Sequence, residues 1–183
     1  MKISERMARI DKALEPLKAD LLAAGVRFKN TGEIHLLHKE DYPIGLPIIF
    51  AHLQMAYDDL PRAIMAEAFY YTKNIHTLNA WPDIAEIYTQ TPNQALPFSD
   101  GALPVQESDA KEMLANALLR LYQPKRFDAV VDIVRNPRNG RTRIILLEPL
   151  LRVRNRRVRA MEVLKELMAD PVLETALSER GVG

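Results

Sequence analysis

Seven arginines lie between residues 141 and 160, in the stretch RTRIILLEPLLRVRNRRVRA, and Glu148 is the single carboxylate there. Guanidinium groups stay charged at neutral pH and bind carboxylates or phosphates through paired hydrogen bonds. This stretch is therefore a candidate docking site for an acidic protein, or a candidate phosphate-binding strip. The candidate partner-binding arginines are Arg141, Arg143, Arg152, Arg154, Arg156, Arg157 and Arg159.

A third interpretation of the arginines needs no partner. Arg152 and Arg154 fall near the end of a predicted helix, where a cation offsets the carbonyl dipole. Arg143 and Arg159 can each pair with a carboxylate of a neighbouring helix. The carboxylates considered for this pairing are Asp128, Asp132 and Glu162.

The second set of candidate partner-binding residues is aromatic: Tyr70, Tyr71, Trp81 and Tyr88. Tryptophan and tyrosine are enriched among the residues that dominate interface energies. Trp81 directly precedes Pro82, so a core position is the alternative for this side chain. All four lie far in sequence from the arginines, which weakens the nucleic-acid interpretation, because base stacking needs aromatics beside cations.

Motifs for catalysis or metal binding are weak. His35 and His38 have the i, i+3 spacing that puts two imidazoles on one helical face, but a metal site needs further ligands. Asp58 and Asp59 precede a proline and fit helix capping better than acid–base chemistry. The chain contains no cysteine, no glycine-rich phosphate loop and no nucleophile elbow. We expect no metal, no cofactor and no enzymatic activity.

Composition indicates one domain with a sizeable core, since 48% of the 183 residues are apolar. No apolar run approaches the ~20 residues of a membrane span, and the charged start MKISERMARIDKALEP does not resemble a signal peptide. We therefore expect a cytoplasmic protein with no membrane contact. The net charge is −4 over residues 1–134 and +5 over residues 135–183. This polarity suggests a face for an acidic partner.

The elements that must position these residues are predicted to be helices. An apolar stripe over residues 3–24 indicates an amphipathic helix, with a break near Ala13 to Glu15 caused by Pro16 and an end at Gly25. Residues 26–41 are irregular, with one short helix near Ile34 to His38. Residues 90–104 form a long loop rich in proline.

Further helices are predicted to begin at prolines, because proline suits the first helical turn. Pro43, Pro61 and Pro82 mark three such starts, and Asp59 and Asp170 are the predicted caps. No convincing strand pattern is present, so the fold class is all-α. The later helical segments are VQESDAKEMLANALLRLY, PKRFDAVVDIVRN, GRTRIILLEPLLRV, RNRRVRAMEVLKELMA and PVLETALSER.

This succession of paired short helices resembles a HEAT-like, armadillo-type repeat protein. The resemblance is best over residues 140–181, where Asp170-Pro171 followed by Ala176-Leu177 resembles the end of one hairpin and the start of the next. Weaker similarity covers residues 42–70 and 111–136. It implies a single domain over residues 1–183, a short right-handed α-solenoid of about four hairpins over residues 42–181, with residues 1–25 as a capping helix.

The resemblance implies a non-enzymatic protein-binding module of the adaptor, immunity or inhibitor type, using a concave helical surface. Two alternatives stay open. HEAT-like repeats also build alkylpurine DNA glycosylases, although no catalytic position of that group can be matched here. The acidic and basic regions could also pair between copies in a self-associating structural protein, such as a homodimer.

Overall fold

The computed structural model describes residues 3–28, 37–72, 75–93, 109–154 and 158–182. Within these ranges the chain is helical and contains no strand, which confirms the all-α prediction. No helix in this part is long and apolar enough to cross a membrane. The α-helices are α1 (Ile3–Ala13), α2 (Glu15–Ala23), α3 (Tyr42–Leu53), α4 (Asp59–Tyr71), α5 (Ile75–Asn79), α6 (Trp81–Gln90), α7 (Asp109–Arg120), α8 (Phe127–Arg135), α9 (Arg143–Leu146), α10 (Glu148–Val153), α11 (Val158–Leu167) and α12 (Glu174–Ser178), and the 3₁₀ helices are η2 (Lys39–Asp41), η3 (Pro124–Arg126) and η4 (Pro137–Asn139).

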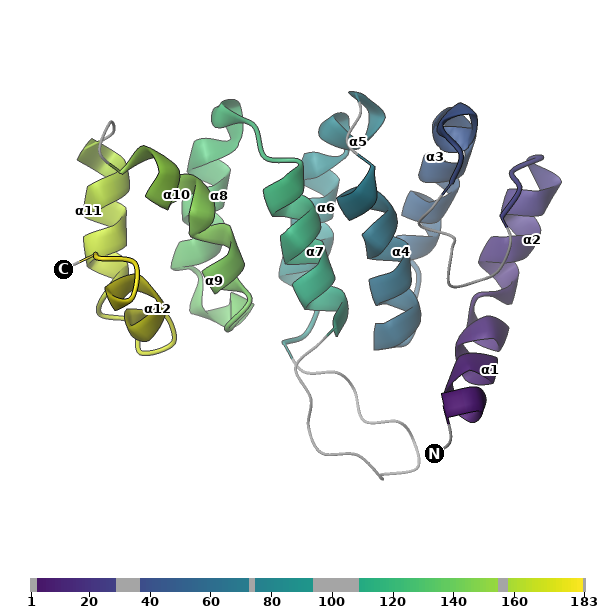
Figure 1. The fold of residues 1–183 in the computed structure, drawn as a ribbon, viewed down its shortest axis with the longest axis horizontal. Coiled ribbons are helices and arrows are strands. Elements are labelled where there is room, and N and C mark those ends of the chain that lie inside the picture. The colour runs from purple at the N-terminus through teal and green to yellow at the C-terminus, as the bar shows by residue number, and fades with distance from the viewer. Residues whose placement is uncertain (1–2, 29–36, 73–74, 94–108, 155–157, 183) are drawn as a thin grey trace.

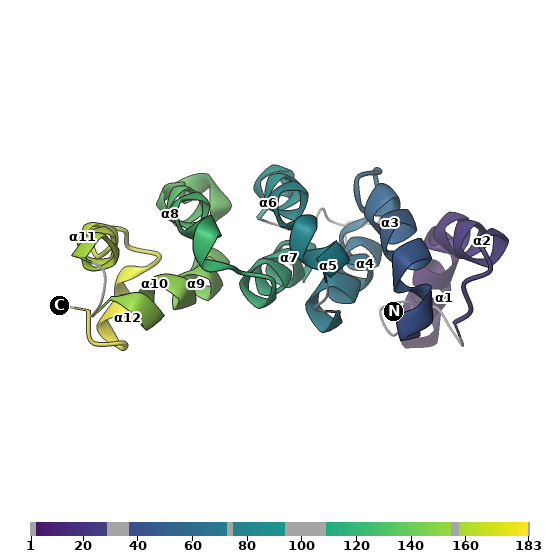
Figure 2. The same ribbon diagram turned by 90° about the horizontal axis from the view of Figure 1, so that it is seen from above.

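The helices line up in one elongated row, with the two termini at opposite ends (Figure 1). Seen from above, the row has two layers (Figure 2). The first layer contains α2, α3, α6, α8 and α11, and the second contains α1, α4, α7, α9, α10 and α12. Neighbours in the row pack pairwise, which is compatible with a helical repeat. The hairpin number, the domain boundaries and the hand of the superhelix stay predictions.

The closest packing in the row is between α4 and α7 of the second layer. Buried alanines on both helices, including Ala63, Ala66, Ala110 and Ala117, allow the two backbones to approach. Asp59 adds a polar link, because its carboxylate accepts a 2.8 Å hydrogen bond from the backbone N–H of Asp109 at the start of α7. The sequence predicts Asp59 as a cap of its own helix, whereas in the structure its carboxylate binds the N-terminus of α7, the next second-layer helix.

Local signals in the sequence located most helix ends. The break predicted near Ala13 to Glu15 is confirmed, since α1 ends at Ala13 and α2 begins at Glu15. Gly25 has a φ of 81°, and the N–H of Val26 donates to the carbonyl of Leu21, as in a left-handed helix end. The predicted short helix near Ile34 to His38 and most of the 90–104 loop lie outside the described residues.

One predicted helix is divided. Residues 141–153 form α9 and α10 with an interruption at Leu147, since Pro149 has no N–H to donate to the carbonyl of Ile145. The apolar residues of these helices and of α11 are mostly buried: Leu146, Leu147, Leu150 and Leu164 are fully buried and Leu167 is 5% exposed. Val158 is an exception, because it is 77% exposed at the start of α11.

We expect Leu164→Ala to lower the free energy of unfolding by about 2–5 kcal/mol, because it removes a fully buried side chain from close packing. Leu22→Ala is the matched control, since Leu22 is also helical but 59% exposed. Urea denaturation of both variants measures the difference. Equal stability of the two variants would contradict the packed core.

Candidate functional site

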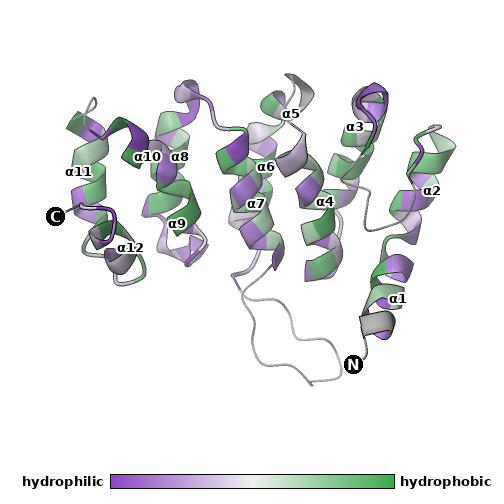
Figure 3. Cartoon of the chain, viewed as in Figure 1, coloured by the Kyte–Doolittle hydropathy of each residue, from purple (hydrophilic) through white to green (hydrophobic). Residues whose placement is uncertain are grey.

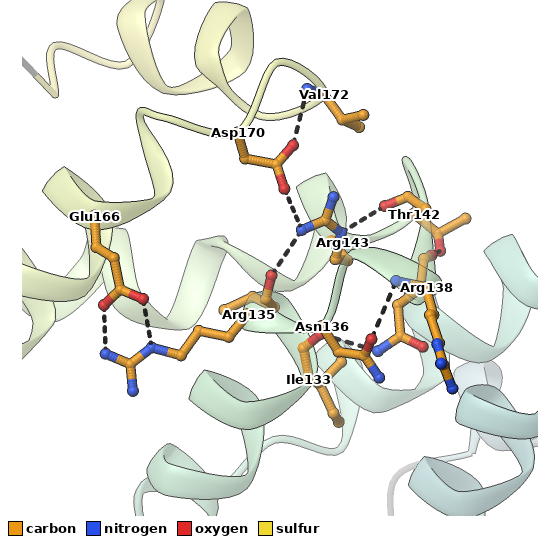
Figure 4. A network of polar contacts seen from close by, with 12 residues as sticks. Ile133, Arg135, Asn136, Arg138, Thr142, Arg143, Glu166, Asp170 and Val172 are labelled. Carbon is orange, nitrogen blue, oxygen red and sulfur yellow. Dashed lines mark hydrogen bonds and ion pairs between the residues drawn. The ribbon is translucent and has the colours of Figure 1, made fainter.

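Arg143 is the most deeply embedded of the candidate arginines, with 1% of its surface exposed. Its Nε donates to the carbonyl of Gly140 at 2.8 Å. One terminal nitrogen donates both to the carbonyl of Val134, at the end of α8, and to the carboxylate of Asp170, at 3.0 and 2.7 Å. Figure 4 shows this guanidinium between α8, its own turn and the segment leading to α12. Arg143 is therefore a structural tie and is not exposed to a partner, which differs from the sequence prediction.

Asp170 is the carboxylate on which Arg143 depends. Its other oxygen accepts the N–H of Val172 at 2.9 Å, which fixes the turn that leads into α12 (Figure 4). The hydrogen bond from Arg143 is the main cause that lowers the pKa of Asp170 below its usual value. The predicted capping role of Asp170 is wrong, because the N-cap of α12 is Leu173; Asp170 instead holds the preceding turn and forms an ion pair that the sequence did not reveal.

The turn that carries Arg143, residues 136–142, is also held from the preceding helix pair. Asn93 donates a 2.8 Å hydrogen bond to the carbonyl of Arg138. The hydroxyl of Tyr88 contacts that of Thr142 at 2.9 Å, and burial raises the pKa of Tyr88 to about 12, so this hydroxyl stays protonated. Gly140 has a φ of 65°, and a Cβ there would lie 2.6 Å from Cγ of Asn93. Only glycine fits this position without displacing Asn93.

The other described arginines of the strip also donate to groups of this chain. Arg152 pairs with Glu148 at 2.8 Å, and Arg159 pairs with Asp128 at 2.8 Å, a pairing that the sequence proposed. Arg154 donates to the carbonyl of Arg180. Arg141 is exposed, and Arg156 and Arg157 lie outside the described residues. The contacts of this strip therefore favour the interpretation that needs no partner.

The four candidate aromatics separate into two pairs. Trp81 is 2% exposed and donates its indole N–H to the carbonyl of Leu118 at 3.0 Å, and Tyr88 is fully buried. These two side chains belong to the core, and their burial differs from the predicted partner-binding role. Tyr70 and Tyr71 are 36% and 55% exposed and lie edge to face, with ring centroids 5.1 Å apart. Only this pair stays a candidate for partner contact.

Lys111 is a buried cation that the sequence analysis did not single out. It is 1% exposed, and its Nζ donates to the carbonyl of Thr91 at 2.7 Å and lies 4.8 Å from the ring centroid of Tyr88. Burial lowers the pKa of Lys111 to about 8. A lysine in a polar-looking helix start gives no local signal of burial, so only the packing of α7 against α6 reveals it.

The histidines fit structural roles. His52 is 3% exposed, and its Nε2 lies 2.8 Å from the Asp20 carboxylate and its Nδ1 lies 2.7 Å from the hydroxyl of Tyr57. His38 is exposed, and the side chains of His35 and His76 are outside the described part. Among the described residues no three potential metal ligands are grouped.

The outward side of the second layer is a candidate binding surface. On α4, Leu60, Ile64, Glu67 and Tyr71 recur at helical spacing and are all at least partly exposed. Because α7 packs against both α4 and α9, the outward residues of the three helices form one surface, which we call the α4–α7–α9 face. It consists of Leu60, Ile64, Glu67, Tyr71, Asp109, Glu112, Met113, Asn116, Arg120, Arg141, Ile144 and Ile145.

Apolar and charged side chains alternate on the α4–α7–α9 face. Figure 3 shows hydrophobic and hydrophilic residues side by side on the helices nearest the viewer. Glu112, Ile144 and Ile145 line a pocket of about 330 Å³ together with Arg141 and Thr142. An apolar side chain of a partner, accompanied by a polar group, can fill such a pocket.

Comparison of the chain with known protein families, with curated proteins and with solved structures finds no match.

We expect Asp170→Asn to lower the free energy of unfolding by about 2–3 kcal/mol, because it leaves the buried guanidinium of Arg143 without its counter-charge. Asp128→Asn is the control, since the Arg159–Asp128 pair is exposed and should contribute little. Chemical denaturation at pH 7 measures both. A larger loss for Asp128→Asn than for Asp170→Asn would contradict the structural role of Arg143.

The same ion pair predicts a dependence on pH. Since the pKa of Asp170 is lowered in the folded state, its stabilisation is present above the ordinary aspartate pKa of about 3.9 and is lost as the pH falls through the lowered value. The stability difference between the original protein and Asp170→Asn should therefore shrink as the pH is lowered below about 4. A difference that stays constant from pH 7 to the acid transition would contradict this linkage.

Proposed function

We propose that this protein is a non-enzymatic protein-binding module of the adaptor, immunity or inhibitor type, and that the α4–α7–α9 face binds its partner. The observation that carries this proposal is the alternation of partly exposed apolar side chains and charged side chains across three neighbouring helices. Taken as a whole, protein interfaces also combine apolar and polar area. Met113 of α7 and Ile145 of α9 supply apolar groups on two of these helices.

The first-layer surface over α8 and α11 supports this choice of face. In the first layer, Arg135 of α8 pairs with Glu166 of α11 through two hydrogen bonds, and Arg159 pairs with Asp128 between the same helices. These exposed charges already have partners within the chain. A surface whose charges are mutually satisfied offers less to a protein partner than one with half-buried apolar groups.

The arginine contacts also favour a protein partner over nucleic acid. Phosphate binding draws its strength from cations that exchange counterions for phosphates. Arg143 is buried, and Arg152, Arg154 and Arg159 donate to groups of this chain. No observation in the described ranges specifically favours the glycosylase-type or the self-associating alternative.

The proposal predicts that the double variant Met113→Glu, Ile145→Glu loses its partner, because each new carboxylate is buried without a counter-charge in the interface. We expect affinity to fall by at least ~30-fold, the effect of losing a hot spot. Val158→Glu is the matched control, since it places a carboxylate on an exposed apolar residue of α11 in the first layer. The immobilised protein and both variants are exposed to nuclease-treated extract of the source cells, and retained proteins are quantified by mass spectrometry.

A protein retained by the original chain and by Val158→Glu, and lost with the double variant, is the expected result. Identical retention by all three would count against the α4–α7–α9 face. We also expect no DNA binding at ~50 mM salt, where electrostatic binding is strongest. Tight DNA binding under those conditions would replace the protein-binding proposal with the nucleic-acid alternative.

A further inference from the structure

Helix α3 has an unusual composition for its place in the fold. Its sequence, YPIGLPIIFAHL, contains no Asp, Glu, Lys or Arg, although 27% of the chain is charged. Leu46, Ile49 and Leu53 face the core, but the other side is apolar as well: Ile44 is 48% exposed, and Pro47 is also exposed. A helix that is apolar all round is normally covered on all sides. Here α3 lies in the first layer with one side facing solvent (Figure 2).

A pocket opens beside this apolar side. In the second layer α4 and α7 pack tightly, whereas α3 and α6 above them do not pack closely against each other. The space between them is a pocket of about 330 Å³. Its lining includes Leu46, Pro47 and Phe50 of α3, Phe69 of α4, and Ala80 and Asp83 at the start of α6. Phe69 and Phe50 lie edge to face, with centroids 6.1 Å apart, so two aromatic rings shape the pocket.

On α3 and α6, the two helices that flank this pocket, every Asp, Glu, Lys or Arg is acidic. Neither α3 nor α6 contains a lysine or arginine, while α6 carries Asp83 and Glu86, both exposed. Glu86 accepts a hydrogen bond from Gln90, and Asp83 has no ion pair among the described residues. An apolar pocket with an unneutralised carboxylate on its lining selects a ligand that is apolar at one end and cationic at the other.

We propose that the α3–α6 pocket binds a segment of a protein partner that carries a bulky apolar side chain next to a lysine or arginine. The apolar side chain enters between Phe50, Phe69 and Ala80, and the cation lies over Asp83. A volume of about 330 Å³ is at the lower end for ligand sites and suits one or two side chains. The exposed apolar side of α3 extends the contact beyond the pocket. This site lies mainly between first-layer helices, and none of its lining residues belongs to the α4–α7–α9 face.

The test uses three peptides as probes and the full chain as receptor. Acetyl-Leu-Phe-Lys-Lys-amide has both required features, acetyl-Leu-Phe-Glu-Glu-amide reverses the charge, and acetyl-Ala-Ala-Lys-Lys-amide lacks the apolar side chains. Binding is followed by ¹H–¹⁵N NMR spectra of the protein. We expect saturable shifts of amides around Leu46, Phe50 and Asp83 with the first peptide only.

Two kinds of variant separate the charge from the pocket. Asp83→Asn should lower the affinity for the first peptide by about 2- to 5-fold, which is the contribution of an exposed ion pair. Asp132→Asn, on neighbouring α8, should leave this affinity unchanged. Ala80→Phe should fill the pocket and abolish binding; Ala80 has a φ of −73°, which any L-residue adopts. Pro47→Lys, at an exposed position, should also abolish binding by placing a cation at the pocket.

The proposal is overturned if no saturable shift appears at millimolar peptide, if the acidic peptide binds equally well, or if both Ala80→Phe and Pro47→Lys bind as the original chain does. The double variant Met113→Glu, Ile145→Glu should bind the peptide normally. Loss of peptide binding in that variant would merge the two sites into one and overturn the independence of this pocket. Failure of partner capture by the α4–α7–α9 face leaves the peptide result unaffected.

Discussion

The guanidinium of Arg143 joins the end of α8, the turn before α9 and the segment before α12, and the packing of these elements depends on it. It donates to the end of α8, to its own turn at Gly140, and to Asp170 before α12. From the other side, Tyr88 and Asn93 hold the same turn against α6. Apolar stripes alone allow neighbouring helices to slide, because dispersion and burial have no direction. A buried ion pair prevents such sliding, because displacement separates the charge from its counter-charge.

The two layers differ in the interactions that hold them together and in the surfaces that they expose. Between α8 and α11, exposed charges of the first layer form ion pairs, so this part of the layer presents a polar surface with internally paired charges. The second layer is held by close packing of α4 against α7, and its outward apolar residues are only partly exposed. The difference arises from helix phase: the same i, i+4 spacing that buries Ala66 and Leu114 turns Ile64 and Met113 outward.

Local features were readable from the sequence, and tertiary ones were not. Pro16, Pro43 and Gly25 locate helix ends because each acts through its own backbone. The all-α class follows equally from apolar periodicity. Arg143 and Asp170 are 27 positions apart, and Asp59 and Asp109 are 50 positions apart. Both contacts depend on how the helices stack. For the same reason the sequence could place Trp81 and Tyr88 near or on helices but could not tell whether their side chains lie in the core or at the surface.

The internal pairing of arginines also changes which partner chemistry the molecule favours. From composition, the +5 charge over residues 135–183 suggested an acidic partner. In the fold, several of those cations form ion pairs with Glu148, Glu166, Asp128 and Asp170. Asp83 on α6, by contrast, has no ion pair among the described residues. A partner is attracted by the charges that remain unpaired at the surface, because the electric fields of two paired charges largely cancel at the distance of an approaching partner. At the α3–α6 pocket those charges are carboxylates, and the complementary segment is therefore a basic one with an apolar anchor.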